Sequence, residues 1–277
     1  MIEDQAICVR IWDWSETSQT AVLLTRDHGM IRVLAKGSKR DRSSFSGGLE
    51  LCTLGHMAAI LRPNSELALL TQWDLLGPMR GIRQHILAYN AAMLGIDLIP
   101  RLIQDHDPHA SVFEALGELL NFCNAPEISD SAELESQTLG MLAWYLWTVL
   151  VAVGAMPIVD HDVLTGNPLI PSDVYGFSAQ LGGVTQDPIT GAGVLADHSR
   201  SVAQGVWRIR AQSIELMKSL GQNPPIGRFM EQSGDQNSRL ARLLGAYIRE
   251  RTGTEIPALH WLLNPLGEYY SFLDQSS

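Results

Sequence analysis

The stretch "TAVLLTRDHGMIRVLAKGSKR", residues 20–40, carries the strongest indication of the N-terminal fold. Its two apolar runs, "TAVLLTR" and "MIRVLAK", flank the turn "DHG", in which Gly29 suits the positive φ of a tight hairpin. The preceding segment "QAICVRIWDW" alternates apolar and polar side chains, as a half-buried strand does. Residues 5–36 are therefore predicted to form three consecutive strands.

Two further apolar runs, "ELCTLGHMAAILR" and "ELALLTQWDLL", follow and are separated by the turn signal "PNS". A long, basic and Ser/Gly-rich connection separates the third predicted strand from the fourth. Five short strands with such a connection are typical of a small closed barrel of the OB type. An SH3-like barrel is the alternative, and the sequence does not separate the two.

From about Gly77 the apolar period becomes helical, and residues 83–99, 107–122 and 130–153 are predicted helices. Asp107 is expected to be the N-cap of the second, with Pro108 at its first position.

A Gly/Pro-rich segment then lacks a periodic apolar face, and helical character returns at about Ala196 and ends near Gly253. The predicted fold class is α+β, with an OB-fold nucleic-acid-binding domain over residues 1–77. A helical domain is expected over residues 78–277, with a Gly/Pro-rich insertion at 154–195.

Charge is divided unevenly along the chain, whose formal net charge is -10. Residues 1–101 carry 11 Lys and Arg against 10 Asp and Glu, and residues 200–277 carry 9 against 7. Residues 102–199 carry 13 acids and no Lys or Arg. A polyanion would be repelled by this middle segment and received by the two ends.

Several classes of protein are disfavoured by the composition. Three widely spaced cysteines indicate reduced thiols and a cytoplasmic protein, and the start "MIEDQAICVR" has no basic region typical of a secretory signal. The longest apolar run, residues 139–153, is shorter than the ~20 residues that a membrane span needs. No G-x-S-x-G, H-E-x-x-H or phosphate-loop motif is present, so we expect no enzyme activity.

Three N-terminal motifs occur in series: "SETS" at residues 15–18, "LLTRDHG" at 23–29 and "AKGSKR" at 35–40. With "RLARLLGAY" at residues 239–247, they resemble the bacterial recombination mediator family RecO. The resemblance implies a non-enzymatic DNA repair protein that binds single- and double-stranded DNA and anneals complementary strands. It also implies that RecR and the tail of single-strand-binding protein (SSB) are partners, and that the recombinase is loaded on SSB-coated DNA.

Many members of that family carry a four-cysteine zinc module in the insertion. The corresponding positions here are Asp162, Thr165, Gln186 and Ile189. Thr and Ile cannot supply the thiolate ligands that a tetrahedral zinc site needs. Zinc is therefore predicted absent, and no other cofactor is expected.

The basic stretch after the third predicted strand is the candidate DNA site, because cations beside an OB barrel can replace the counterions of a phosphate backbone. A solvated basic loop is the alternative for such a cluster. Phe45 is the preferred base-stacking residue, whereas alternation places Trp12 and Trp14 more often in a core. The predicted DNA-binding residues are Arg32, Lys36, Lys39, Arg40, Arg42 and Phe45.

A secondary basic surface is predicted on two later helices, one carrying Arg208 and Arg210 and the last carrying Arg239, Arg242 and Arg249. For each residue alone, a solvated helix face paired with Glu250 and its neighbours is the preferred explanation, and the secondary surface is proposed only because of the charge division along the chain. Two other functions remain open: a protein–protein adaptor whose barrel does not bind nucleic acid, and an RNA-binding OB protein.

Overall fold

The computed structural model describes residues 1–40, 44–45, 48–62, 65–124, 131–186, 206–222 and 234–263. The chain forms two compact units, Met1–Leu134 and Glu135–Ser277. The predicted domain division after residue 77 stays a prediction.

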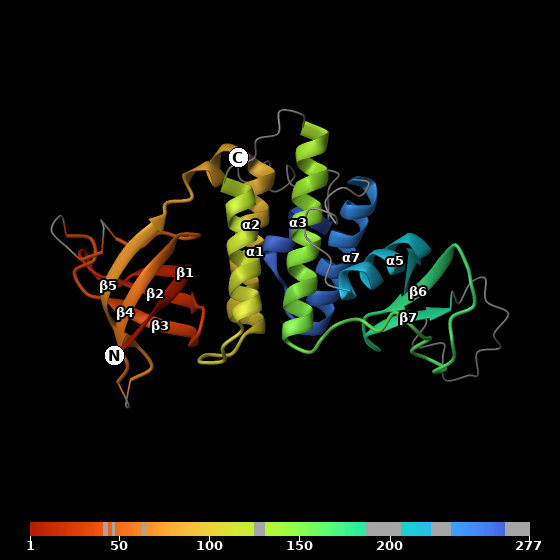
Figure 1. Ribbon diagram of the computed structural model, residues 1–277, viewed down its shortest axis with the longest axis horizontal. Coiled ribbons are helices and arrows are strands. Elements are labelled where there is room, and N and C mark those ends of the chain that lie inside the picture. Colours follow the sequence, from red (N-terminus) through yellow and green to blue (C-terminus); the bar gives the residue numbers. More distant parts are fainter. Residues whose placement is uncertain are drawn as a thin grey trace, which may run out of the picture. The chain divides into compact units, whose positions relative to one another are not determined.

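Five strands form the closed barrel of the first unit: β1 (Ile2–Asp13), β2 (Gln19–Thr25), β3 (Gly29–Ala35), β4 (Leu54–Ile60) and β5 (Ala68–Gly77). Figure 1 shows them wrapped around one another at the N-terminal end of the chain. The strand order β1-β2-β3-β5-β4 closes through antiparallel pairing of β1 with β4, and β3 pairs with β5 in parallel. This order is that of the OB fold, so the predicted barrel type is confirmed.

Alternation along the strands fills the barrel. Ile31, Val33 and Ala35 of β3 point into the core, whereas Arg32 is exposed. The hairpin between β2 and β3 turns at Gly29, whose φ is +73° and whose missing Cβ would lie 2.6 Å from the backbone of Asp107. Only glycine fits there, because it both tolerates the positive φ and leaves room for the neighbouring chain.

Two helices, α1 (Ile86–Leu102) and α2 (Ala110–Asn124), follow the short 3₁₀ helix η1 (Arg80–Gln84). They lie side by side (Figure 1), and α1 contacts β1 while α2 contacts β2. The predicted start of α2 is wrong by two to three residues. The N–H of Phe113 bonds to the carbonyl of His109, so the helix begins at Ala110, and the Asp107 carboxylate lies 3.0 Å from His109 Nε2.

The second unit contains most of α3 (Ser131–Ala152), then β6 (Val174–Ser178), β7 (Gly183–Gln186) and β8 (Val206–Arg210). These strands form an antiparallel sheet in the order β7-β6-β8. α5 (Ala211–Gly221), α7 (Gly234–Thr252), η3 (Pro257–Leu259) and α8 (His260–Leu263) follow. The Phe177 ring of β6 stacks on Trp207 and meets Tyr247 of α7 edge to face, with centroids 5.9 and 5.4 Å apart.

The predicted helix over Arg208 and Arg210 is wrong, because both lie on strand β8. Arg208 and Arg210 are exposed on either side of buried Ile209, which is a period of two rather than 3.6. Among the helices of the described segments, none has the length and apolar character needed to cross a bilayer.

Candidate nucleic-acid interface

A basic turn, residues 36–40, leaves the end of β3 and is fixed by its backbone to the β1–β2 turn, residues 14–18. The N–H of Gly37 donates to Ser18 Oγ at 3.0 Å, and the N–H of Lys39 donates to the carbonyl of Thr17 at 3.1 Å. The buried Ser38 hydroxyl donates to Gln19 Oε1 at 2.9 Å. These bonds hold the basic turn in one place while its long side chains remain outside.

The cations of the basic turn face solvent. Lys36 and Arg40 are exposed and form no ion pair within the described parts of the chain. Lys39 Nζ lies 2.5 Å from Oδ1 of Asp13, a carboxylate whose side chain is 70% exposed. An exposed pair of this kind contributes at most about 1 kcal/mol, so Lys39 can exchange Asp13 for another anion.

Arg32 has a different environment although it lies on the same strand. Its Nε donates to Asp105 Oδ2 at 2.8 Å, in the connection between α1 and α2, and the N–H of the adjoining His106 donates to the carbonyl of Met30 at 3.0 Å. Arg10 on β1 pairs in the same way with Asp97 of α1, at 3.0 Å. Arg32 therefore links the helical connection to the barrel, and the nearby Asp105 carboxylate offsets part of its charge.

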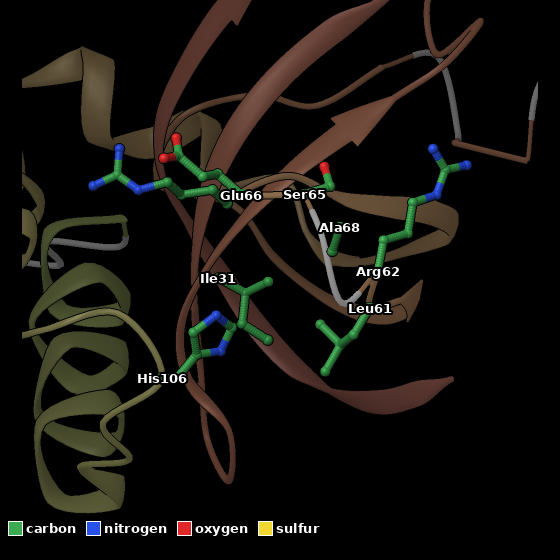
Figure 2. A pocket seen from close by; sticks show the side chains of 8 residues that line it. Ile31, Leu61, Arg62, Ser65, Glu66, Ala68 and His106 are labelled. Carbon is green, nitrogen blue, oxygen red and sulfur yellow. The ribbon is translucent and has the colours of Figure 1, made fainter.

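A pocket of about 210 Å³ lies beside the middle of β3, where Ile31 and Arg32 contribute to its lining. Figure 2 shows that Arg62 and Glu66 of the β4–β5 connection extend in opposite directions. Ile31 and His106 line the same pocket and lie close to each other. Acidic and basic side chains are mixed around it. The lining therefore favours no single class of ligand.

Phe45 does not offer its ring to a base, so the prediction for this residue is wrong. It is 4% exposed and belongs to the barrel core with Trp73. The Ser44 hydroxyl donates to the carbonyl of Thr71, and the backbone N–H of Trp73 donates to the carbonyl of Ser44, so this short segment is bonded to β5. The polar residues around Phe45 in the sequence suggest an exposed loop, but the phenyl ring is packed in the core of the barrel.

Trp12 and Trp14 show the reverse error, since they are 50% and 63% exposed. A β-bulge between Cys8 and Arg10 shifts the register of β1 against β2. Before the bulge, even-numbered residues such as Cys8 point into the barrel. After the bulge, the odd-numbered Ile11 points inward instead. The indole of Trp12 consequently faces outward.

Arg42 lies outside the described residues. The remaining predicted basic residues belong to the second unit, and most have internal partners. Arg239 pairs with Asp235, Arg242 Nε donates to the carbonyl of Leu262 at 3.2 Å, and Arg249 lies 3.4 Å from Glu250.

At the positions that the resemblance assigns to zinc ligands, a carboxylate takes the central place. Asp162 is 6% exposed, and its side chain accepts four hydrogen bonds. The donors are the N–H groups of Leu164 at 2.7 Å, Thr165 at 3.3 Å and Gln186 at 3.0 Å, and the Thr185 hydroxyl at 3.0 Å.

This Asp162 cluster joins the 162–166 loop to the end of β7. Ile189 lies outside the described residues. Within the segments that the structure describes, no three His, Cys, Asp or Glu side chains are arranged to hold a metal ion.

Comparison with known proteins gives one family match and relatives that align over different shares of the chain. Residues 1–79 match the family described as "Recombination protein O N terminal". "DNA repair protein RecO" of Anaeromyxobacter sp. (strain Fw109-5) is 28% identical over 257 residues, 92% of this chain and 93% of that protein. The protein of the same name from Symbiobacterium thermophilum is 24% identical over 92% and 94%. That from Rhodopirellula baltica is 36% identical over 39% and 40%.

Proposed function

Because this chain belongs to the RecO family of DNA repair proteins, we propose that it is a recombination mediator that binds DNA phosphates through the basic turn. The family is one of non-enzymatic mediators. Its members need cations on an accessible surface rather than a group that makes or breaks bonds.

The exposure of Lys36 and Arg40 carries the proposal. Cations on a turn whose backbone is already fixed lose little conformational freedom on binding. Contact with phosphates releases condensed counterions, which drives binding that is independent of sequence. The acidic segment 102–199 repels the same polyanion, so it favours approach to the barrel.

The finer activities follow from family membership. We infer binding to single- and double-stranded DNA, annealing of complementary strands, and recombinase loading together with RecR on SSB-coated DNA in the cytoplasm. Neutralising the phosphates of two strands at one surface lowers their repulsion, which favours pairing.

Three further parts of the proposal concern the rest of the chain. The barrel domain ends near residue 77, and the described part of the insertion, residues 154–186, is organised around Asp162 without zinc. The secondary basic surface contributes little, because Arg239, Arg242 and Arg249 already have partners within the second unit.

A salt titration tests the role of the basic turn. Fluorescence anisotropy of a labelled single-stranded oligonucleotide is measured over a salt series with the parent protein and with Lys36→Ala/Arg40→Ala. The variant should bind more weakly, and the slope of log affinity against log salt should become shallower by about 1.4, since each phosphate contact contributes about 0.7.

The matched control is Arg80→Ala/Arg83→Ala, which removes the same charge from two exposed arginines of η1. The control should keep the parent slope. Equal slopes for all three proteins would reject the basic turn as the DNA site. Capture of RecR without DNA affinity at low salt would favour an adaptor, and preference for an RNA oligonucleotide of the same sequence would favour an RNA-binding protein.

A further inference from the structure

Two tryptophans stand apart from the others in this chain. Trp12 and Trp14 are at least half exposed, whereas Trp73, Trp144, Trp147, Trp207 and Trp261 are buried or half-buried. Large aromatic side chains stabilise a fold mainly by being buried. Two exposed indoles two residues apart contribute little to folding, which points to a ligand.

The barrel presents Trp12 on the outer face of β1–β2–β3. Register places Trp12 opposite Thr20, and Thr20 opposite Leu34, so these three side chains form one row across the strands. In the next row, Arg10 and Arg32 are tied to Asp97 and Asp105 of the helical part. The face is therefore covered beyond Arg10 and Arg32, and Trp12 marks its uncovered end.

The cations of the basic turn adjoin the same end. Trp14 belongs to the β1–β2 turn, where its backbone N–H donates to the carbonyl of Ser18 at 2.9 Å. Ser18 and Thr17 in turn accept the bonds from Gly37 and Lys39 that fix the basic turn. Two exposed aromatic faces and three cations thus share one hydrogen-bonded corner of the barrel.

Acidic groups at this corner weaken the positive field without removing it. Asp13, between the tryptophans, is paired with Lys39, and Glu16 of the β1–β2 turn is exposed. Lys36 and Arg40 remain available for phosphates.

We propose that Trp12 and Trp14 stack on the bases of an unpaired DNA strand whose phosphates lie on the basic turn. This inference rests on the proposed function and adds selectivity for strand state. Base faces are covered by neighbouring pairs in a duplex but are free in a single strand, and stacking on aromatic side chains is tolerant of sequence. The cations bind both forms of DNA, whereas the indoles distinguish them.

The test compares three variants with the parent protein at one salt concentration, using a single-stranded oligonucleotide and a duplex of the same length. Trp12→Ala/Trp14→Ala should lose about 30-fold or more in single-strand affinity, because two stacking contacts are removed. Its duplex affinity and its salt slope should stay at parent values. Trp12→Phe/Trp14→Phe should retain most of the single-strand affinity, because a phenyl ring also stacks.

The control is Leu75→Ala/Leu76→Ala, which removes two exposed apolar side chains from β5 and should alter neither affinity. Quenching of intrinsic fluorescence by the single strand should be reduced in the Phe variant although it binds. Thermal unfolding followed by circular dichroism checks that each variant is folded.

Each outcome distinguishes the inference from the function on which it rests. Parent-like single-strand affinity in the Trp→Ala variant, together with weak binding by Lys36→Ala/Arg40→Ala, would overturn the stacking site alone. An equal loss for single strand and duplex would overturn the selectivity. Unchanged binding by the basic-turn variant would overturn the proposed function.

Discussion

Lys36 and Arg40 of the basic turn lie in solvent, whereas the carboxylate of Asp162 in the second unit is 6% exposed and accepts four hydrogen bonds. Water solvates the first two charges, so their removal changes the surface and not the fold. A buried carboxylate is stabilised by its donors alone, and the donors lose their partner if it is removed. Charged residues are thus accessible to a ligand in one unit, whereas a charged residue organises a loop in the other.

The largest effect is expected where the buried charge is removed. Asp162→Ala should lower the free energy of unfolding by about 4 kcal/mol, because several donors in a largely buried site lose a charged acceptor. Asp162→Asn keeps one carbonyl oxygen as acceptor and should lose less. Urea unfolding followed by circular dichroism measures both.

If the Asp162 cluster holds the loop without a metal, a zinc chelator should leave the unfolding midpoint of the parent protein unchanged. A midpoint that falls with chelator, or equal stability of Asp162→Ala and parent, would contradict this role of the carboxylate.

The next effect concerns buried groups that have no such donors. Burial raises the pKa of Cys52 and of Cys123 to about 12, and raises that of Cys8 further. The folded state therefore keeps its thiols neutral. Below about pH 9 the unfolded thiols are neutral as well, so thiol ionisation does not lower the free energy of unfolding there. Above that pH unfolded thiols ionise, and each should remove about 1.4 kcal/mol of stability per pH unit.

Urea unfolding at pH 8 and pH 10 measures this loss. Cys123→Ala should show a smaller decline with pH than the parent protein does. An equal decline in both would show that ionisation of this thiol is not responsible.

The smallest effect is expected for Arg32, which differs from Arg40 of the same basic stretch because it forms an ion pair with Asp105. Arg32→Ala should lower stability by about 1 kcal/mol or less, because its pair with Asp105 is partly exposed. Its salt slope for single-stranded DNA should equal that of the parent, unlike the slope of Lys36→Ala/Arg40→Ala. A double-mutant cycle with Asp105→Ala isolates the pair energy. A shallower slope for Arg32→Ala would place this residue among the phosphate contacts.

Much of the barrel could be predicted, because hairpin turns and alternation are local properties of the sequence. The face exposed by Trp12 could not, because one extra residue in β1 reverses the direction of every side chain after it. A weak signal exists: inward apolar residues fall on even positions at Ala6 and Cys8 and on an odd position at Ile11. Phe45 was misplaced because its burial depends on β5, which is distant in sequence.

In the second unit, the absence of a zinc site could be predicted from residues such as Thr165. The hydrogen bonds of Asp162, which hold this region together instead, could not be predicted. The bonds that Asp162 accepts come from backbone N–H groups and from Thr185, 23 residues away, so no motif records them. The sequence predicts a helix at Arg208 and Arg210 because strand β8 is only five residues long and leads directly into helix α5.

The ion pair between Lys39 and Asp13 bears on how quickly a bound strand can depart. In the proposed complex, the Asp13 carboxylate can replace a phosphate that dissociates from Lys39, so the ammonium does not depend on solvent or salt for its next partner. Such an internal substitute shortens residence without abolishing attraction.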